Sequence, residues 1–138
     1  MRRTEQRRAA VVAAYQHDLT GRPLAQTLPR TANAFTRALA AAAVERAPEL
    51  DELIGRHARG WTVARIAPLE RAILRVALVE MIAPGAVPAE TPIAAEGAID
   101  EAVETAKVFC AADAAGFVNG VLDAILREVR ENEAHAHA

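Results

Sequence analysis

PLERAILRVALVEMI, residues 68–82, is the stretch that determines the fold of this 138-residue chain. Pro68 suits the first turn of a helix, and the carboxylate of Glu70 is favourable to the helix dipole there. Apolar side chains occur on more than one side of the helix, namely Leu69, Ile73, Val76, Leu78 and Ile82. A helix that is apolar on several sides is enclosed by other elements, so we predict that it lies at the centre of the domain.

The segments upstream of this helix also carry apolar residues at helical spacing, and none of them shows the alternating pattern that predicts a strand. We predict helices over residues 4–19, after Thr31 and around residues 50–57, with residues 23–30 as a linker. Thr20-Gly21 should cap the first helix, and Gly60 should end the third. The predicted buried stripes are Val12, Tyr15 and Leu19; Phe35, Leu39 and Ala42 or Ala43; and Leu50, Leu53, Ile54 and His57.

Downstream, three prolines and a glycine between Pro84 and Pro92 mark a break, and Thr91-Pro92 is the expected cap of the next helix. Gly97 is a candidate interruption in that helix. Asp113 is placed to cap a last helix. The stripes of these two helices are Ile99, Val103, Ala106 and Phe109 (or Cys110), followed by Phe117, Val121, Ile125 and Val129.

The sequence thus predicts an all-α fold of about seven helices in two packed helical subdomains. We expect a single domain over residues 1–138, with an N-terminal half of about 1–60, a C-terminal half of about 61–133 and a short tail of 134–138. This length is sufficient to bury a core without a disulfide or metal staple. Cys110 is the only cysteine, so an intramolecular disulfide is excluded.

Composition and motifs argue against an enzyme. The sequence contains no phosphate-binding glycine loop, no nucleophile motif and no histidine pair at metal-binding spacing, so we expect no cofactor and no metal. His17, His57, His135 and His137 each have a structural explanation, the last two as part of a frayed tail. Neither a signal peptide nor a membrane span is apparent, and a cytoplasmic location is expected.

Positive charge is concentrated at the start of the chain, where Arg2, Arg3, Arg7 and Arg8 fall within eight residues. These arginines oppose the helix dipole and one another, so folding should gain nothing from them and an anionic partner should balance them. A solvated, disordered N-terminus is the plain alternative. Up to residue 75 there are 13 basic and 7 acidic residues, against 3 and 11 beyond it, which favours directional docking on nucleic acid or on a basic protein.

Phe117-Val118-Asn119-Gly120, at the start of the last predicted helix, combines an aromatic ring, an amide and a glycine. An aromatic ring there can stack on an unpaired base while Asn119 and the helix amides make polar contacts. The glycine either permits close helix packing or lets a ligand approach, and Phe117 is equally compatible with the core.

Five segments together resemble the NusB family of bacterial transcription antitermination factors. They are the arginine-rich lead followed by AAY (13–15), WTVARI (61–66), LERAILRVAL (69–78), AIDEAVETAK (98–107) and FVNGVLD (117–123). Each segment alone is weak, but their order and spacing over nearly the whole chain are specific. The resemblance implies the same all-helical, two-part fold that the periodicity predicts.

The resemblance further implies binding to the boxA element of ribosomal RNA leader transcripts, together with the ribosomal protein NusE, in an RNA polymerase antitermination complex. By resemblance, Arg2, Arg3, Arg7 and Arg8 form one RNA-binding region, and Asp113, Phe117 and Asn119 form a second. Tyr15 and Glu70 are the implied contacts to NusE. Four phosphate contacts to single-stranded RNA would give a log affinity against log salt slope of about −3, which replacing Arg7 and Arg8 with alanine should flatten.

The chain also departs from the family pattern. Ala114 and Gly116 stand where many members have a serine and a basic residue, and residues 89–96 form a longer connection than usual. The alternative function is a helical protein-binding adaptor or homodimer without sequence-specific RNA binding. A related domain precedes some ribosomal RNA methyltransferases, but we expect no methyl-donor-binding domain in this chain.

Overall fold

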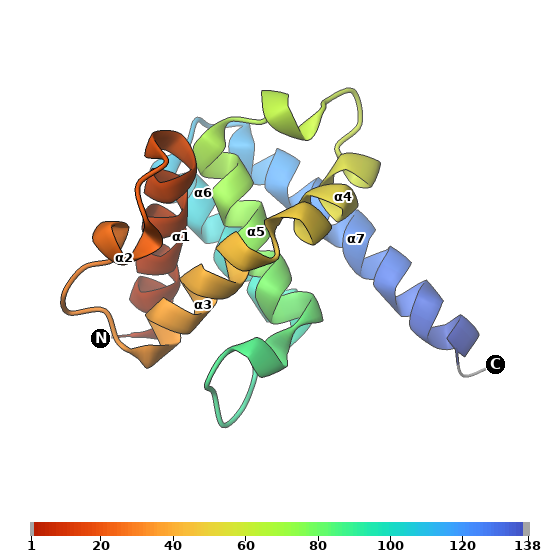
Figure 1. The fold of residues 1–138 in the computed structure, drawn as a ribbon. Coiled ribbons are helices and arrows are strands. Elements are labelled where there is room, and N and C mark those ends of the chain that lie inside the picture. Colours follow the sequence, from red (N-terminus) through yellow and green to blue (C-terminus); the bar gives the residue numbers. More distant parts are fainter. Residues whose placement is uncertain (1, 137–138) are drawn as a thin grey trace.

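The computed structural model describes residues 2–136, and every regular element within them is helical (Figure 1). The α-helices are α1 (Arg3–Thr20), α2 (Leu24–Thr27), α3 (Ala34–Glu45), α4 (Ala47–His57), α5 (Pro68–Ile82), α6 (Ala95–Phe109) and α7 (Ala114–Ala136). Two 3-10 turns, η1 (Val63–Arg65) and η2 (Pro84–Ala86), flank α5. The predicted all-α fold of about seven helices is therefore confirmed.

Helix α5 is the centre of the molecule, as the sequence predicts. It packs against α1, α3, α4, α6 and α7, and Figure 1 shows it between the N-terminal helices and the α6–α7 pair. Its buried residues lie on all sides of the helix: Ala72, Ile73, Leu74, Val76, Ala77, Leu78, Val79 and Glu80. One continuous core therefore spans Gly60, and the division into two halves near that residue stays a prediction.

Of the predicted helix ends, Gly21 closes α1 as expected, whereas α4 ends at His57, before the predicted Gly60. Gly21 has a φ of +72°, a conformation that glycine adopts without strain, and its N–H donates to the carbonyl of His17 to close α1. Asn33 caps α3, because its side-chain oxygen accepts from the N–H of Thr36 at 2.9 Å. The predicted linker of residues 23–30 contains the single turn α2, which is too short to show helical periodicity.

The predicted buried stripe of α1 is wrong. Leu19 is 57% exposed and Val12 and Tyr15 are only half-buried, whereas the buried apolar face consists of Ala10, Val11, Ala13 and Ala14. Small alanine side chains let α1 lie close to α3 and α5, so the larger apolar residues remain at its edges. Large apolar side chains are poor markers of the buried face in a helix this rich in alanine.

Two expectations for α6 are also wrong. Ala94, rather than Thr91-Pro92, precedes the helix, and Gly97 lies within the first turn without interrupting it. A Cβ on Gly97 would stand 2.9 Å from Cγ1 of Ile93, so this glycine accommodates the incoming chain. At the other end, Phe109 is 39% exposed, and it is Cys110 that packs against the core.

At the C-terminus, α7 continues through Ala136, so residues 134–136 of the predicted tail are helical. His137 lies outside the described residues. None of the helices in residues 2–136 combines the length and the apolar character needed to cross a membrane.

Candidate nucleic-acid interface

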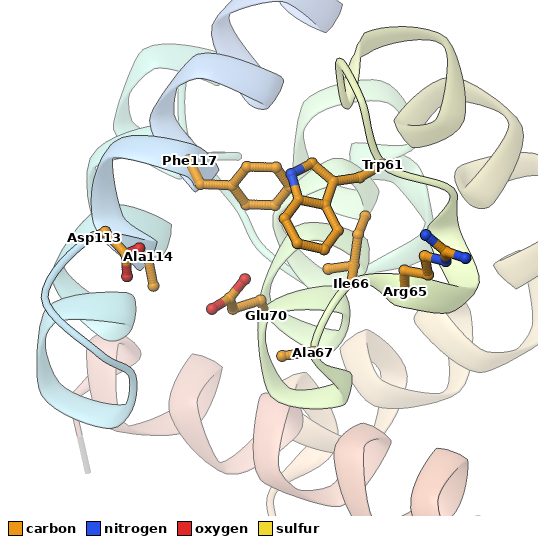
Figure 2. Close-up of a pocket in the computed structure, with 8 residues that line it drawn as sticks. All are labelled: Trp61, Arg65, Ile66, Ala67, Glu70, Asp113, Ala114 and Phe117. Carbon is orange, nitrogen blue, oxygen red and sulfur yellow. The ribbon is translucent and has the colours of Figure 1, made fainter.

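A pocket of about 280 Å³ opens where the segment preceding α5 meets the start of α7. Its lining, drawn in Figure 2, consists of Trp61, Arg65, Ile66, Ala67, Glu70, Asp113, Ala114 and Phe117. The pocket brings together three of the residues predicted as sites, since Glu70 comes from α5 while Asp113 and Phe117 come from the α7 end. Residues that are more than forty positions apart in sequence therefore share one concave surface.

Aromatic side chains form one side of this pocket. Trp61 and Phe117 both line the pocket, and Figure 2 draws their rings apart from the carboxylates of Glu70 and Asp113. Trp61 is 54% exposed, and Phe117 is partly buried against the core. Sequence reasoning used Trp61 only within a family motif and missed it as a site residue; the available signal was a lone tryptophan outside any predicted helix.

The opposite side of the pocket is acidic. Partial burial raises the pKa of Glu70, and the negative charge of Asp113 raises it further. Burial likewise raises the pKa of the neighbouring Cys110 thiol, with a contribution from the charge of Glu70. Because ionised carboxylates only accept hydrogen bonds, this wall suits a ligand that donates N–H groups, such as the amino edge of a nucleobase.

Glu70→Gln is expected to stabilise the fold at neutral pH. With its raised pKa, the folded protein binds the Glu70 proton more tightly than the unfolded chain does, whose carboxyl titrates near 4.5. Protonation of Glu70 therefore stabilises the fold fully below the pKa of the unfolded chain, and this stabilisation is lost as the pH rises through the raised pKa of the folded protein. Thermal unfolding from about pH 4 to about pH 8 checks this. The gain in melting temperature of Glu70→Gln over wild type should shrink toward acidic pH. Glu133→Gln, on the exposed end of α7, serves as control. A gain that does not change with pH would contradict the prediction.

The arginine-rich lead forms the start of α1, with Arg2 in the extended N-cap position. The guanidinium of Arg3 lies 4.0 Å from the centre of the Phe35 ring, a cation–π contact that leaves the residue exposed. Arg8 is half-buried, and its Nε donates to the Thr105 hydroxyl at 3.4 Å. Arg2, Arg3 and Arg8 therefore all reach solvent.

Arg7 is placed differently from the other three arginines. Its side chain is only 12% exposed, and its Nε and Nη2 donate to the two carboxylate oxygens of Glu80 at 2.7 and 3.0 Å. Glu101 is a further acidic neighbour at 3.8 Å. The expectation that an anionic partner must balance the arginines is thus wrong for Arg7, because Glu80 balances its charge inside the protein.

The connection before α6 helps to cover this ion pair. Val87, Ala89, Pro92 and Ile93 share a small cavity with Phe35 and Glu80. The connection between α5 and α6 therefore lies beside Glu80, the carboxylate partner of Arg7.

A second hollow, of about 360 Å³, lies along the outer face of α1. Arg8 and the exposed ring of Phe109 both line it, together with Val12, Gln16, Leu28 and Pro29 among others. Phe109 ends α6, and the next few residues lead to Asp113 at the pocket. Arg8 and an exposed aromatic ring therefore share one hollow.

Besides the four arginines, two further predicted site residues lie outside the pocket. Asn119 is exposed on α7, and Tyr15 packs partly against the core from α1. Gly120, beside Asn119, is also exposed, and a Cβ there would meet no atom within 4 Å. Close helix packing therefore does not explain this glycine.

Known proteins match this chain over almost its whole length. The NusB family model matches residues 4–127. A transcription antitermination protein NusB from Symbiobacterium thermophilum is 35% identical, with 94% of this chain and 92% of that protein covered.

Solved structures give the same result. T. maritima NusB superposes with a TM-score of 0.79 at 29% identity, covering 93% of this chain and 92% of that one. A NusB from a structure of the antitermination factors NusB and NusE in complex with double-stranded RNA has a TM-score of 0.74 at 25% identity, covering 93% and 99%. The order of the helices, the sequence motifs and these matches together show that the chain belongs to the NusB family.

Proposed function

We propose that this protein is an RNA-binding transcription antitermination factor that binds boxA-type single-stranded RNA together with NusE. The observation that carries the proposal is the pocket in which Trp61 and Phe117 face the carboxylates of Glu70 and Asp113. Flat aromatic rings stack on an unpaired base of any kind, while the carboxylates select for a base edge that donates hydrogen bonds. The pocket thus supplies both affinity and a preference for sequence.

The arginines supply the attraction for the phosphate backbone. Arg2, Arg3 and Arg8 reach solvent, and Phe109 offers a further stacking platform in the hollow that Arg8 lines. Because Glu80 already holds the Arg7 guanidinium, we assign the phosphate contacts to the other three arginines and assign to Arg7 the task of holding α1 in place. Three contacts correspond to a salt slope of about −2 for a single strand.

NusE is the proposed protein partner, with Tyr15 and Glu70 as its contacts and RNA polymerase as the larger assembly. Support comes from the family relative whose structure contains NusB, NusE and double-stranded RNA. Glu70 lines the pocket, so in this proposal the RNA and the protein partner meet at the side of the pocket that α5 forms. NusE would then extend the RNA-binding surface and strengthen binding.

Fluorescence anisotropy of labelled RNA tests this proposal. Wild-type protein, with and without NusE, is titrated against boxA RNA, a scrambled RNA of equal length and boxA annealed to its complement, at several salt concentrations. We expect tightest binding to single-stranded boxA and a further gain with NusE. Arg8→Ala should make the salt slope shallower by about 0.7, because one phosphate contact is lost.

Arg127→Ala is the matched control, since this arginine is exposed on α7 and pairs with Asp123 one turn away. It should leave the slope unchanged. Equal, weak binding to all three RNAs with and without NusE would overturn the proposal and favour the adaptor or homodimer alternative. Preference for the annealed duplex would refute the single-stranded part of it.

A further inference from the structure

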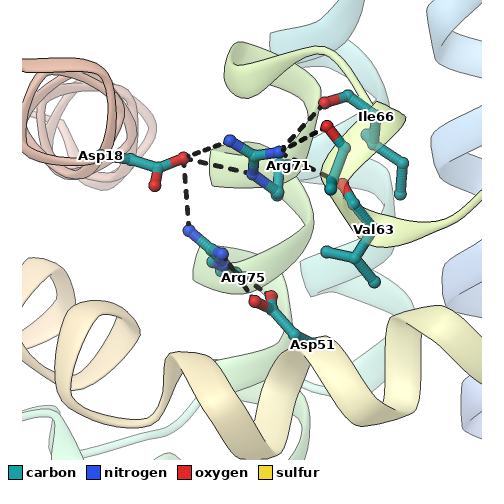
Figure 3. A network of polar contacts seen from close by, with 7 residues as sticks. Asp18, Asp51, Val63, Ile66, Arg71 and Arg75 are labelled. Atoms are coloured by element: carbon teal, nitrogen blue, oxygen red, sulfur yellow. Dashed lines mark hydrogen bonds and ion pairs between the residues drawn. The ribbon is translucent and has the colours of Figure 1, made fainter.

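Arg71, in the second turn of α5, joins three parts of the chain that are distant in sequence (Figure 3). Its Nε and Nη2 donate to Oδ2 of Asp18, near the end of α1, at 3.1 and 2.7 Å. Its Nη1 donates to the carbonyls of Val63, Ala64 and Ile66 at 3.2, 3.5 and 3.3 Å. The side chain is only 14% exposed, so these contacts are formed largely away from water.

The carbonyls that Arg71 holds belong to the segment that builds half of the pocket. Residues 61–67 contribute Trp61, Arg65, Ile66 and Ala67 to its lining. Regular structure in this segment is limited to the one turn η1, and Ile66 is its only fully buried side chain. Apolar packing of Ile66 and the half-buried Val63 is the segment's main anchor in the core, so the contacts of the Arg71 guanidinium with its carbonyls add to the definition of the backbone direction.

We infer that Arg71 is the positioning residue of the pocket, fixing the segment that carries Trp61, and that Asp18 fixes the direction of Arg71. This inference rests on the proposed function for its consequence in RNA binding, but its geometric part concerns the free protein alone. Asp18 also lies 3.5 Å from Arg75, which forms a two-point ion pair with Asp51 of α4. Arg71 is therefore anchored directly to α1, and through Asp18 and Arg75 it is linked to α4.

An arginine is required at this position because its donors diverge in a fixed plane. One edge of the guanidinium faces the carboxylate while the remaining nitrogen reaches the carbonyls. A lysine has the same charge but a single nitrogen, which cannot satisfy both sides with this geometry. Arg71→Lys therefore separates positioning from charge.

The first experiment uses the free protein and needs no RNA. Trp61 is the only tryptophan, so intrinsic fluorescence anisotropy reports the mobility of this segment alone. We expect Arg71→Lys to lower the Trp61 anisotropy, Asp18→Asn to lower it less, and Arg127→Lys on α7 to leave it unchanged. Far-ultraviolet circular dichroism at the same temperature confirms that each variant is folded. An unchanged Trp61 anisotropy in folded Arg71→Lys and Asp18→Asn would overturn the inference, even if thermal stability fell.

The second experiment measures the effect on RNA. Arg71→Lys should weaken binding to boxA RNA by about tenfold, the scale of one lost hydrogen bond to a charged group, without changing the salt slope. A shallower slope would mean that Arg71 contacts phosphate and would overturn the inference. If wild-type protein shows no preference for boxA, the proposed function fails, whereas the Trp61 anisotropy still decides whether Arg71 positions the segment.

Discussion

Arg7→Ala is expected to lower the free energy of unfolding by about 3 kcal/mol. The reason is the carboxylate that the substitution leaves behind, since Glu80 is only 7% exposed and loses the guanidinium that neutralises it. The variant also loses the contact of Arg7 with the Phe35 ring, 5.5 Å from its centre. Urea unfolding followed by circular dichroism measures the change, with wild-type protein in the same buffer.

Arg8→Ala is the matched control, because it removes the same side chain from the next position of the same helix. Arg8 is half-buried and makes only a long contact to a hydroxyl, so its loss should change stability by no more than about 0.5 kcal/mol. In RNA binding the larger effect should come from Arg8→Ala, which changes the slope of log affinity against log salt, whereas Arg7→Ala leaves that slope unchanged. Equal losses of stability would contradict the assignment of separate roles.

A double substitution tests the origin of the effect. Arg7→Met with Glu80→Met removes both charges and leaves apolar side chains in an environment that Phe35 and the connection before α6 already make apolar. Replacing a buried ion pair by apolar residues is often neutral or stabilising, so the double variant should recover most of the stability lost in Arg7→Ala. No recovery would show that the pair contributes through its geometry rather than through the unpaired Glu80 charge.

Trp61→Ala is expected to weaken binding to boxA RNA by about tenfold, with little effect on folding. The exposed indole stabilises the fold little, but it forms one wall of the pocket. Removing a ring on which a base stacks costs about 1–3 kcal/mol per base. Anisotropy titration of labelled boxA RNA measures the loss, and Leu19→Ala, which truncates a similarly exposed apolar side chain on α1, should change nothing.

Combining Trp61→Ala with Phe117→Leu shows whether the two rings hold the same base. Leucine is chosen at position 117 because the ring is packed partly against the core and alanine would leave a cavity. If both rings contact one base, the loss in the double variant should differ from the sum of the single losses. Strict additivity would place the rings on separate nucleotides, and unchanged affinity in Trp61→Ala would remove this residue from the interface.

The fold could be predicted from the sequence because the helices carry local signals. Pro68 opens α5 and Gly21 closes α1, and both effects depend on the backbone of a single residue. The buried face of α1 could not be predicted in the same way. Alanine has no strong preference between core and surface, so the face is decided by how close α3 and α5 can approach.

Part of the site was also accessible from sequence. Asp113, Phe117 and Glu70 were singled out by motif, and they line one pocket. The different role of Arg7 was not accessible, because it depends on Glu80, which lies 73 positions away and approaches only when α1 packs on α5. Nor could periodicity identify Trp61, since the only regular structure in its segment is the short 3-10 turn η1.

The alignment of α1 with α6 has a consequence for how the chain can vary in length. Thr4 donates to Glu101 and Arg8 to Thr105, so the two helices run in the same direction with partners 97 positions apart. This register is fixed by side-chain contacts and by the shared support of α5, and Ile93 from the connection before α6 lies beside it. Because a surface loop gains length at little entropic cost, residues can be added at the exposed positions of the two connections, 29–31 and 90–92, without sliding one helix along the other. Proteins built on this plan can therefore differ in overall length and still present the same face to their partners.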